Sequence, residues 1–166
     1  IEAYETLTRI ALEPDDETYL RLSYAHYQLE QYEEAIPPML KNFEIRRANN
    51  EEIPKNSYGL LRALYLTLED FEKAYQVVRE MVVLYNEPQD WIMLAQLSAS
   101  LERFSDNAHL YWVSKVGGFL DRENHFVSLA QLLSSNDNPY ACGEVISKAL
   151  DEGILKEEIS HLKLAS

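Results

Sequence analysis

The sequence predicts an all-α protein in which antiparallel helix pairs stack as an α-solenoid of about ten helices. Three observations lead to this prediction. Apolar residues recur at spacings of three and four, the period of a helix with one buried face. The segments between these patterns are short and carry turn-forming residues, which favours antiparallel neighbours. A pattern of aromatic, leucine and small residues also recurs down the chain, as in a repeat protein.

Interruptions of the periodicity place the helices one by one. Pro14-Asp15-Asp16, Gly117-Gly118 and Asn136-Asp137-Asn138-Pro139 mark turns, because such residues end helices or cap the next one. The connection from Ala48 to Lys55 is longer and polar. The predicted helices cover residues 2–12, 16–29, 32–47, 54–68, 71–85, 88–101, 104–116, 122–134, 139–152 and 156–165.

One motif recurs in each helix pair. An aromatic residue opens the first helix, followed by Leu and a small residue; a second aromatic residue opens the second helix and precedes Ala. The aromatic residues fill gaps between helices, Leu faces the core, and the small residues let the helices approach closely. The copies are Tyr19-x-x-Leu22-Ser23 with Tyr32-x-x-Ala35, Tyr58-x-x-Leu61-Arg62 with Phe71-x-x-Ala74, Trp91-x-x-Leu94-Ala95 with Phe104-x-x-Asn107, and, more weakly, Phe126-x-x-Leu129-Ala130 with Tyr140-Ala141.

A second repeat signal supports the weaker fourth copy. Gly118-Phe119-Leu120 matches Gly153-Ile154-Leu155, and each Gly suits a left-handed residue just past a helix end. Some positions depart from the motif. Larger residues replace the small ones at Arg62 and Asn107, Gly143 stands where Ala is expected, and Pro37-Pro38 is expected to bend the helix that contains it.

This spacing resembles the tetratricopeptide repeat (TPR), a unit of about 34 residues in two helices. Tyr32 and Phe71 are 39 residues apart, which an insertion in the segment from Ala48 to Lys55 explains. The resemblance implies a right-handed superhelix, in a single domain covering 1–166, that binds other proteins. Its units are repeats at about 16–49, 55–88, 88–121 and 122–155, with partial units at 1–14 and 156–166.

The order of unit-specific features resembles one group of these proteins more closely. It consists of Tyr32-Glu33-Glu34-Ala35-Ile36-Pro37, the polar insertion, Leu60-Leu61-Arg62-Ala63-Leu64-Tyr65, Trp91-Ile92-Met93-Leu94, Leu129-Ala130-Gln131-Leu132 and Pro139-Tyr140-Ala141. This order is similar to that of the periplasmic TPR proteins that accompany TonB–ExbB–ExbD energy-transduction systems in marine gammaproteobacteria. The resemblance implies a periplasmic location and partners of the TonB, ExbB or ExbD type.

The residues indicate no catalytic site, no metal site and no cofactor. A net charge of −13 argues against nucleic acid, since phosphate binding uses a surplus of Lys and Arg. No apolar run reaches the 18 or so residues of a membrane helix. His26 is expected to pack at a repeat position, His109 and His125 lack Cys, Asp or Glu at ligand spacing, and Cys142 is expected to be a buried, inert thiol.

In a stacked array the first helix of each pair lines the concave face. With one Arg and no Lys, this face is poorly suited to clamp a terminal carboxylate, and its Tyr, Leu, Met and Gln residues suit an apolar helix or an extended segment. Alternatively, several of these side chains pack between neighbouring helices. The residues expected to line a partner-binding groove are Arg21, Tyr24, Tyr27, Gln28, Leu60, Ala63, Thr67, Met93, Gln96, Ser128 and Gln131.

Three hypotheses for function remain open. The first is a non-catalytic periplasmic scaffold in a TonB-type uptake system. The second is a cytoplasmic TPR scaffold or co-chaperone, which a signal peptide in the full-length sequence would exclude. The third is an accessory domain of a larger cell-envelope enzyme. In each case, open repeat ends would also allow a homodimer.

Overall fold

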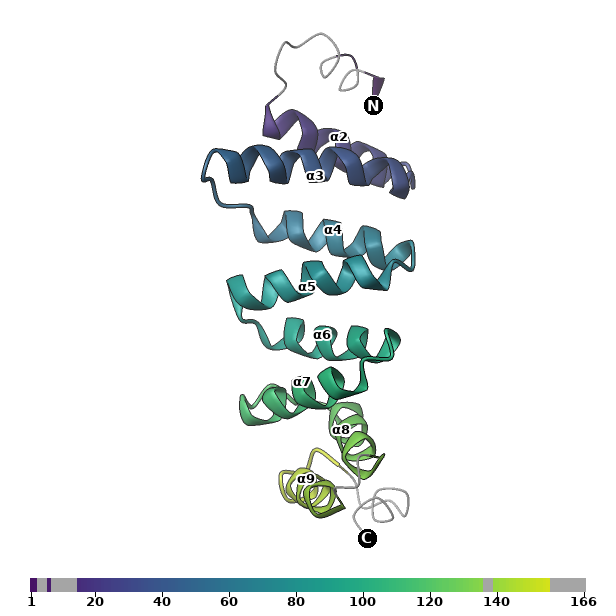
Figure 1. Ribbon diagram of the computed structural model, residues 1–166, viewed down its shortest axis with the longest axis vertical. Helices are drawn as coiled ribbons and strands as arrows, with labels where there is room; N and C mark the ends of the chain where they lie inside the picture. The colour runs from purple at the N-terminus through teal and green to yellow at the C-terminus, as the bar shows by residue number, and fades with distance from the viewer. Residues whose placement is uncertain (3–5, 7–14, 136–138, 156–166) are drawn as a thin grey trace. The chain divides into compact units, whose positions relative to one another are not determined.

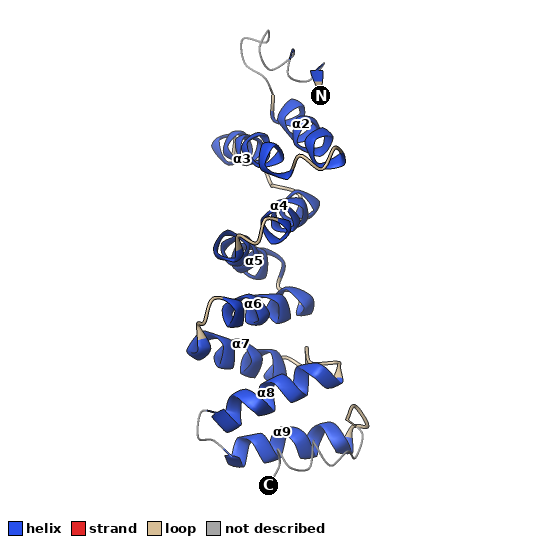
Figure 2. Cartoon of the chain, turned by 90° about the vertical axis from the view of Figure 1, so that its right-hand side faces the viewer, coloured by secondary structure: helices blue, strands red, loops and turns tan. Residues whose placement is uncertain are grey.

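The computed structural model shows a chain of α-helices joined by short turns (Figure 1). The structure describes residues 1–2, 6, 15–135 and 139–155, and within these ranges no strand occurs (Figure 2). The helices form because apolar side chains at helical spacing bury one face of each against its neighbours. They are α2 (Asp16–Gln28), α3 (Tyr32–Ala48), α4 (Lys55–Thr67), α5 (Phe71–Tyr85), α6 (Pro88–Ser100), α7 (Phe104–Val116), α8 (Glu123–Ser135) and α9 (Pro139–Asp151).

The all-α prediction is confirmed, and each of these helices lies within one residue of its predicted bounds. About ten helices were expected, and the described residues form eight of them. The two others, predicted at 2–12 and 156–165, fall largely outside the described residues. The partial end units, and the homodimer expected through them, also fall there and stay predictions.

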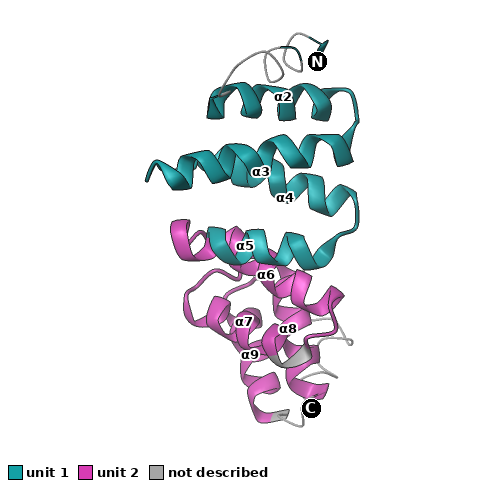
Figure 3. Cartoon of the chain, turned by 45° about the horizontal axis from the view of Figure 1, so that its top comes forward, with its two compact units in different colours: residues 1–81 teal, residues 82–166 magenta. Residues whose placement is uncertain are grey.

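The chain divides into two compact units, residues 1–81 and 82–166, and the boundary lies inside α5 (Figure 3). In unit 1, α2 packs along α3. Ser23, the small residue of the first motif copy, is fully buried, and its hydroxyl donates a hydrogen bond to the carbonyl oxygen of Ala35 at 2.7 Å. This hydrogen bond joins the two helices directly.

An aromatic residue connects the other helices of unit 1. Tyr58, which opens the motif on α4, packs edge-on against Phe43 of α3 with ring centroids 4.8 Å apart. Its hydroxyl donates to Glu80 Oε1 of α5 at 2.8 Å, and the same oxygen lies 2.6 Å from Arg47 Nη2 of α3. The predicted role of this aromatic position, to fill the gap against the preceding helix pair, is therefore confirmed for the second copy.

Unit 2 contains α6 paired with α7 and α8 paired with α9. Asn107, which stands where the motif has Ala, is 1% exposed, and its Nδ2 donates to the carbonyl oxygen of Ala95 at 2.5 Å. In sequence position, Ala95 corresponds to Ser23 and Asn107 to Ala35. The hydrogen bond at the crossing therefore runs from the second helix to the first, the reverse of its direction in unit 1. This exchange explains why Asn is tolerated at the position.

The predicted alignment of the fourth copy is wrong by one residue. Tyr140 was expected to open its second helix as a packing residue, but it is 83% exposed. Helix α9 begins at Pro139, which thus corresponds to Tyr32. Cys142, three residues later, is fully buried and takes the place of Ala35. A thiol is small enough for a helix crossing, and the motif aromatic is replaced by a residue that favours a helix start.

Left-handed residues follow most helices. Gly118 and Gly153 have φ values of 71° and 70°, as predicted, and the amide of the following residue donates back to the helix, as in a Schellman motif. The same turn carries a glutamate after α2, α4 and α6, at Glu30, Glu69 and Glu102. A side chain in this conformation costs about 1 kcal/mol, so these three turns are strained where the two glycine turns are not.

Pro37 and Pro38 do not interrupt α3, which runs for 17 residues. Each proline lacks the amide hydrogen that would bond to the carbonyl four residues earlier, on Glu33 or Glu34. Both of these glutamates are exposed, so water can satisfy their carbonyls. The lost hydrogen bonds are therefore tolerated without a break in the helix.

The left-handed turn gives a first test of the fold. Gly118→Ala should destabilise the protein by about 1 kcal/mol through backbone conformation alone, because no atom lies within 4 Å of the added methyl group. Gly59→Ala is the matched control, since its added methyl also meets nothing within 4 Å but its backbone is helical. We expect Gly59→Ala to be neutral or stabilising. Urea denaturation measures both, and equal effects of the two changes would refute this explanation.

The crossing hydrogen bond gives a second test. Asn107→Ala restores the residue type of the repeat motif, so the motif alone predicts a gain in stability. From the structure we expect a loss of about 1 kcal/mol, because a buried hydrogen bond and its packing disappear. Thermal and urea unfolding decide between these outcomes. Cys142→Ala, at the corresponding position of the next pair, is the control and should cost less, since it removes one sulfur atom where Asn107→Ala removes a whole amide group.

Candidate functional site

The predicted groove residues of α2 form an aromatic and polar surface at the end of that helix. Tyr27 is 38% exposed, and its ring lies 5.8 Å from that of Tyr32 on α3, measured between centroids. Tyr24 is half-buried and Gln28 is exposed. Arg21, the one cation predicted for the groove, lies 2.9 Å from Glu17 on its own helix. Its charge is therefore balanced locally.

The predicted residues of α4 divide into inner and outer positions. Leu60 is 8% exposed, so nearly all of its surface packs inside unit 1. Ala63 is half-buried and Thr67 is exposed at the end of the helix. Among these three positions, Thr67 and Ala63 offer surface to a partner and Leu60 offers little.

In unit 2 the predicted residues come together. Gln96 on α6 and Ser128 and Gln131 on α8 line one hollow of about 550 Å³. The wall of this hollow also contains residues outside the predicted set, among them Asn107 and Tyr111 of α7 and Ser135 of α8. Asn107 therefore both fixes the α6–α7 crossing and borders this hollow.

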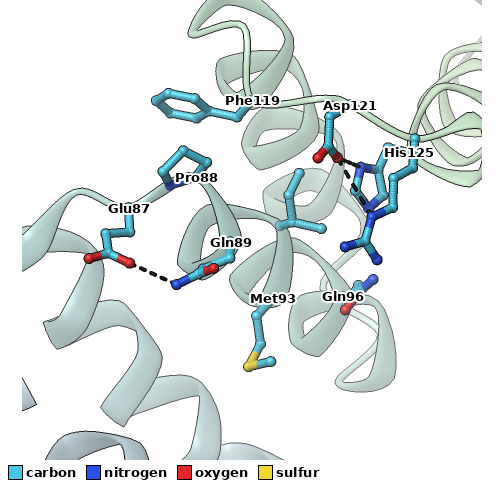
Figure 4. Close-up of a pocket in the computed structure, with 10 residues that line it drawn as sticks. Glu87, Pro88, Gln89, Met93, Gln96, Phe119, Asp121 and His125 are labelled. Carbon is cyan, nitrogen blue, oxygen red and sulfur yellow. Dashed lines mark hydrogen bonds and ion pairs between the residues drawn. The ribbon is translucent and has the colours of Figure 1, made fainter. Parts of the chain in front are cut away.

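A second hollow of about 310 Å³ adjoins the first, because Gln96 lines both. The predicted residue Met93 also lies in it, as Figure 4 shows. We call this smaller hollow the α6/α8 pocket, and the two hollows together the unit-2 groove. The remaining residues of the α6/α8 pocket are Glu87, Pro88, Gln89, Ile92, Phe119, Asp121, Arg122 and His125.

Most residues of the α6/α8 pocket were not predicted, because the predicted groove positions lie only on the first helix of each pair. Phe119, Asp121 and Arg122 belong to the turn between α7 and α8, and Glu87 precedes α6. Asp121 also stands four residues before His125, a spacing that can bring the two side chains together, although no acidic partner was assigned to His125 from the sequence. The left-handed Gly118 is the signal that could have located this turn, since it reverses the chain after α7.

His125 is a buried titratable residue of the α6/α8 pocket. Its side chain is 8% exposed, and Nδ1 lies 3.3 Å from Asp121 Oδ1, although the two do not form a hydrogen bond. Burial lowers the pKa of His125, Asp121 partly opposes this, and the nearby Arg122 lowers it further. The contact with Asp121 becomes an ion pair when the imidazole is protonated.

Two other polar side chains of the pocket, Gln89 and Arg122, lie near carboxylates. Gln89 Nε2 donates to Glu87 Oε2 at 2.7 Å. Arg122 Nε lies 3.8 Å from Asp121 Oδ1, and the Arg122 side chain is 73% exposed. The pocket thus has two carboxylates, one largely solvated guanidinium and an apolar wall made of Pro88, Ile92, Met93 and Phe119.

Two other residues that could take part in catalysis or metal binding, His26 and Cys142, lie in structural positions. His26 Nδ1 is 2.9 Å from Gln31 Oε1, next to the α2–α3 turn. Cys142 is fully buried, and burial raises the pKa of its thiol, which disfavours the reactive thiolate. The described residues contain no group of three or more His, Cys, Asp or Glu arranged to hold a metal ion. They also include no helix long and apolar enough to cross a membrane.

Comparison with solved structures identifies the fold. MamA has a TM-score of 0.62 at 14% identity, over 92% of this chain and 85% of MamA. The C-terminal part of a TPR repeat-containing protein from Cytophaga hutchinsonii has a TM-score of 0.61 at 13% identity, over 90% of this chain and 57% of that one. A chain of the APC/C hetero-tetramer Cut9–Hcn1 has a TM-score of 0.53 at 15% identity, over 99% of this chain and 31% of the other.

The chain has a TPR-type fold. At such low identity the likeness shows the arrangement of helices and not the ligand. No protein-family model and no curated protein matches the sequence. The resemblance to the TonB-associated group therefore still rests on the order of sequence features alone.

The pKa of His125 tests the geometry of the α6/α8 pocket. Its neighbours should shift this pKa in opposite directions: Asp121→Asn should lower it further, because the carboxylate favours the imidazolium, and Arg122→Gln should raise it. NMR titration of the ring signals measures both changes. If both variants moved the pKa in the same direction, the side chains could not lie around the ring as the structure places them.

Proposed function

We propose that this chain is a non-catalytic protein-interaction module that holds a segment of a partner protein along the unit-2 groove. The observation that carries this proposal is that two glutamines at equivalent positions of neighbouring repeats line the same hollow. Gln96 and Gln131 each stand five residues after the aromatic that opens their repeat, Trp91 or Phe126, and both line the larger hollow. Two consecutive repeats thus present the same amide to one groove.

The chemistry of the groove favours a polypeptide. An amide side chain offers one acceptor and two donor hydrogens, and the hydroxyl oxygens of Ser128 and Ser135 add acceptors. The Ser135 hydroxyl itself donates to the carbonyl oxygen of Leu132 at 2.9 Å. Together the amides and hydroxyl oxygens match the donors and acceptors of a peptide backbone. A nucleic acid is disfavoured by the net charge of −13.

The similar folds are consistent with such a role. One of them belongs to a hetero-tetramer, Cut9–Hcn1, so in that case the fold takes part in a protein assembly. Stacked helix pairs suit this use, because each pair adds a copy of the same inner positions to a continuous surface. We extend the same use to this chain.

We further propose a cellular setting for the module, as a periplasmic accessory component of a TonB–ExbB–ExbD system that powers uptake. Its support is the order of sequence features described above. A cytoplasmic scaffold or co-chaperone, and an accessory domain of a larger cell-envelope enzyme, are the alternatives. Fractionation of cells that express the full-length protein separates the first two, and recovery in the cytoplasm would contradict the periplasmic proposal.

The groove itself is tested by crosslinking. A photoreactive amino acid at Gln131 should capture a partner segment that mass spectrometry can identify. Gln96→Ala combined with Gln131→Ala should then weaken binding of that segment at least tenfold, since each lost hydrogen bond contributes about 1 kcal/mol.

Gln76→Ala is the matched control, because Gln76 is an exposed helical glutamine of unit 1 whose Nε2 donates to Glu72 of its own helix. It should leave affinity unchanged. If the double variant binds as tightly as the control does, the partner does not use this groove and the proposal fails.

A further inference from the structure

The α6/α8 pocket has the shape and chemistry to receive one side chain of a partner. Figure 4 shows Glu87 on one side and Asp121 with His125 on the other, while Pro88, Phe119 and Met93 border the space between them. The pocket opens onto Gln96, which it shares with the larger hollow. A segment that lies along the groove would therefore pass its mouth.

His125 indicates what kind of group belongs there. The residue is 7% exposed, and its Nδ1 has no hydrogen-bond partner although Asp121 Oδ1 is only 3.3 Å away. A buried ring nitrogen without a partner is unfavourable. Because the ring does not donate to Asp121, the exposed carboxylate beside it keeps its capacity to accept a hydrogen bond from a donor group in the pocket.

Three classes of side chain can be weighed against this arrangement. An acidic group would meet the two carboxylates of Glu87 and Asp121 and be repelled. A neutral apolar group would fill the space beside Met93 but leave the Asp121 carboxylate without a donor. Lysine and arginine have heads that only donate hydrogen bonds and stems that are apolar, so they match both the carboxylate and the apolar wall.

Arg122 does not fill this role itself. Its Nε lies 3.8 Å from Asp121 Oδ1, beyond hydrogen-bonding distance, and its side chain is 73% exposed. Its guanidinium reduces the negative field of the pocket without donating a hydrogen bond from Nε to Asp121 Oδ1. A partner's cation that is held in the pocket replaces water at a site where screening is weaker than at the surface.

We propose that the α6/α8 pocket binds a lysine or arginine side chain of an extended partner segment, with the cationic head on the Asp121 carboxylate and the stem along the apolar wall. This inference rests on the proposed function and adds the chemistry of the partner. An extended segment fits because its backbone donors and acceptors remain available to Gln96 and Gln131, whereas a helix uses its own internally. The net charge of −13 attracts basic segments over longer range.

The test uses a phage-displayed library of random peptides, selected on the full chain. We expect the selected peptides to share one basic position. A selected peptide and its analogue with norleucine at that position are then compared by fluorescence anisotropy. The analogue keeps the apolar stem and loses the charge, and its affinity should be about 10- to 100-fold lower, as for the loss of a charge-assisted hydrogen bond.

Variants of the protein locate the effect. Asp121→Asn should weaken the basic peptide about tenfold or more and leave the norleucine analogue almost unchanged. Glu123→Gln is the matched control, because it removes the same charge from an exposed residue that does not line the pocket. It should have little effect on either peptide.

Two results would overturn the inference while leaving the proposed function intact. One is selection of amphipathic helical peptides without a shared basic position. The other is a basic preference that Glu123→Gln weakens as much as Asp121→Asn does, which would reveal a general attraction to an acidic surface. Selected peptides that bind the Gln96→Ala, Gln131→Ala double variant as tightly as the original chain would instead refute the groove and the pocket together.

Discussion

The close crossing of the two helices in each pair is the constraint on which the other features depend. At this crossing a small residue must stand on at least one helix, and in two pairs a side chain on one helix donates to a carbonyl on the other. Ser23 donates to Ala35 in unit 1, and Asn107 donates to Ala95 in unit 2. The direction of the bond is exchangeable, whereas the short distance between the helices is retained. Each crossing orients its first helix and thereby the inner positions that line the groove.

Strain at the turns follows from the same constraint. A crossing close to the start of the second helix requires the chain to reverse at once, which places one residue in the left-handed conformation. At Glu30, Glu69 and Glu102 that residue is a glutamate, although glycine adopts this conformation without crowding. We have no structural explanation for glutamate at these turns beyond its exposure. The repeat in sequence at these positions thus reflects a repeated turn geometry.

Sequence reasoning was most successful where a single physical requirement fixes the residue. Helix bounds followed from apolar periodicity and turn residues, and Gly118 and Gly153 followed from the left-handed turn. It failed where different residues can meet the same structural requirement, as at a helix crossing or at the start of a second helix. Asn107 was counted as a defect because its hydrogen bond to a neighbouring helix is visible only in three dimensions. Tyr140 was misaligned because it is aromatic, as the motif requires at the start of the second helix. The residue that takes this position in the structure is Pro139, with Cys142 three residues later.

The same distinction applies to the candidate site. Met93, Gln96, Ser128 and Gln131 could be selected because inner positions recur with the repeat, and the structure does bring them together. Leu60, selected by the same rule, is buried instead, since recurrence gives the face of the helix but not the depth of the side chain.

The α6/α8 pocket could not be derived in this way, because much of it comes from the turn after Gly118, where no repeat position exists. Inner positions and turns are also the parts of the chain that the crossing leaves free to vary. A shared fold at 13–15% identity is therefore compatible with a different partner for every array. On the proposed function, selectivity in this chain comes from the amides of the groove and from the turn residues around His125, and not from the motif that builds the fold.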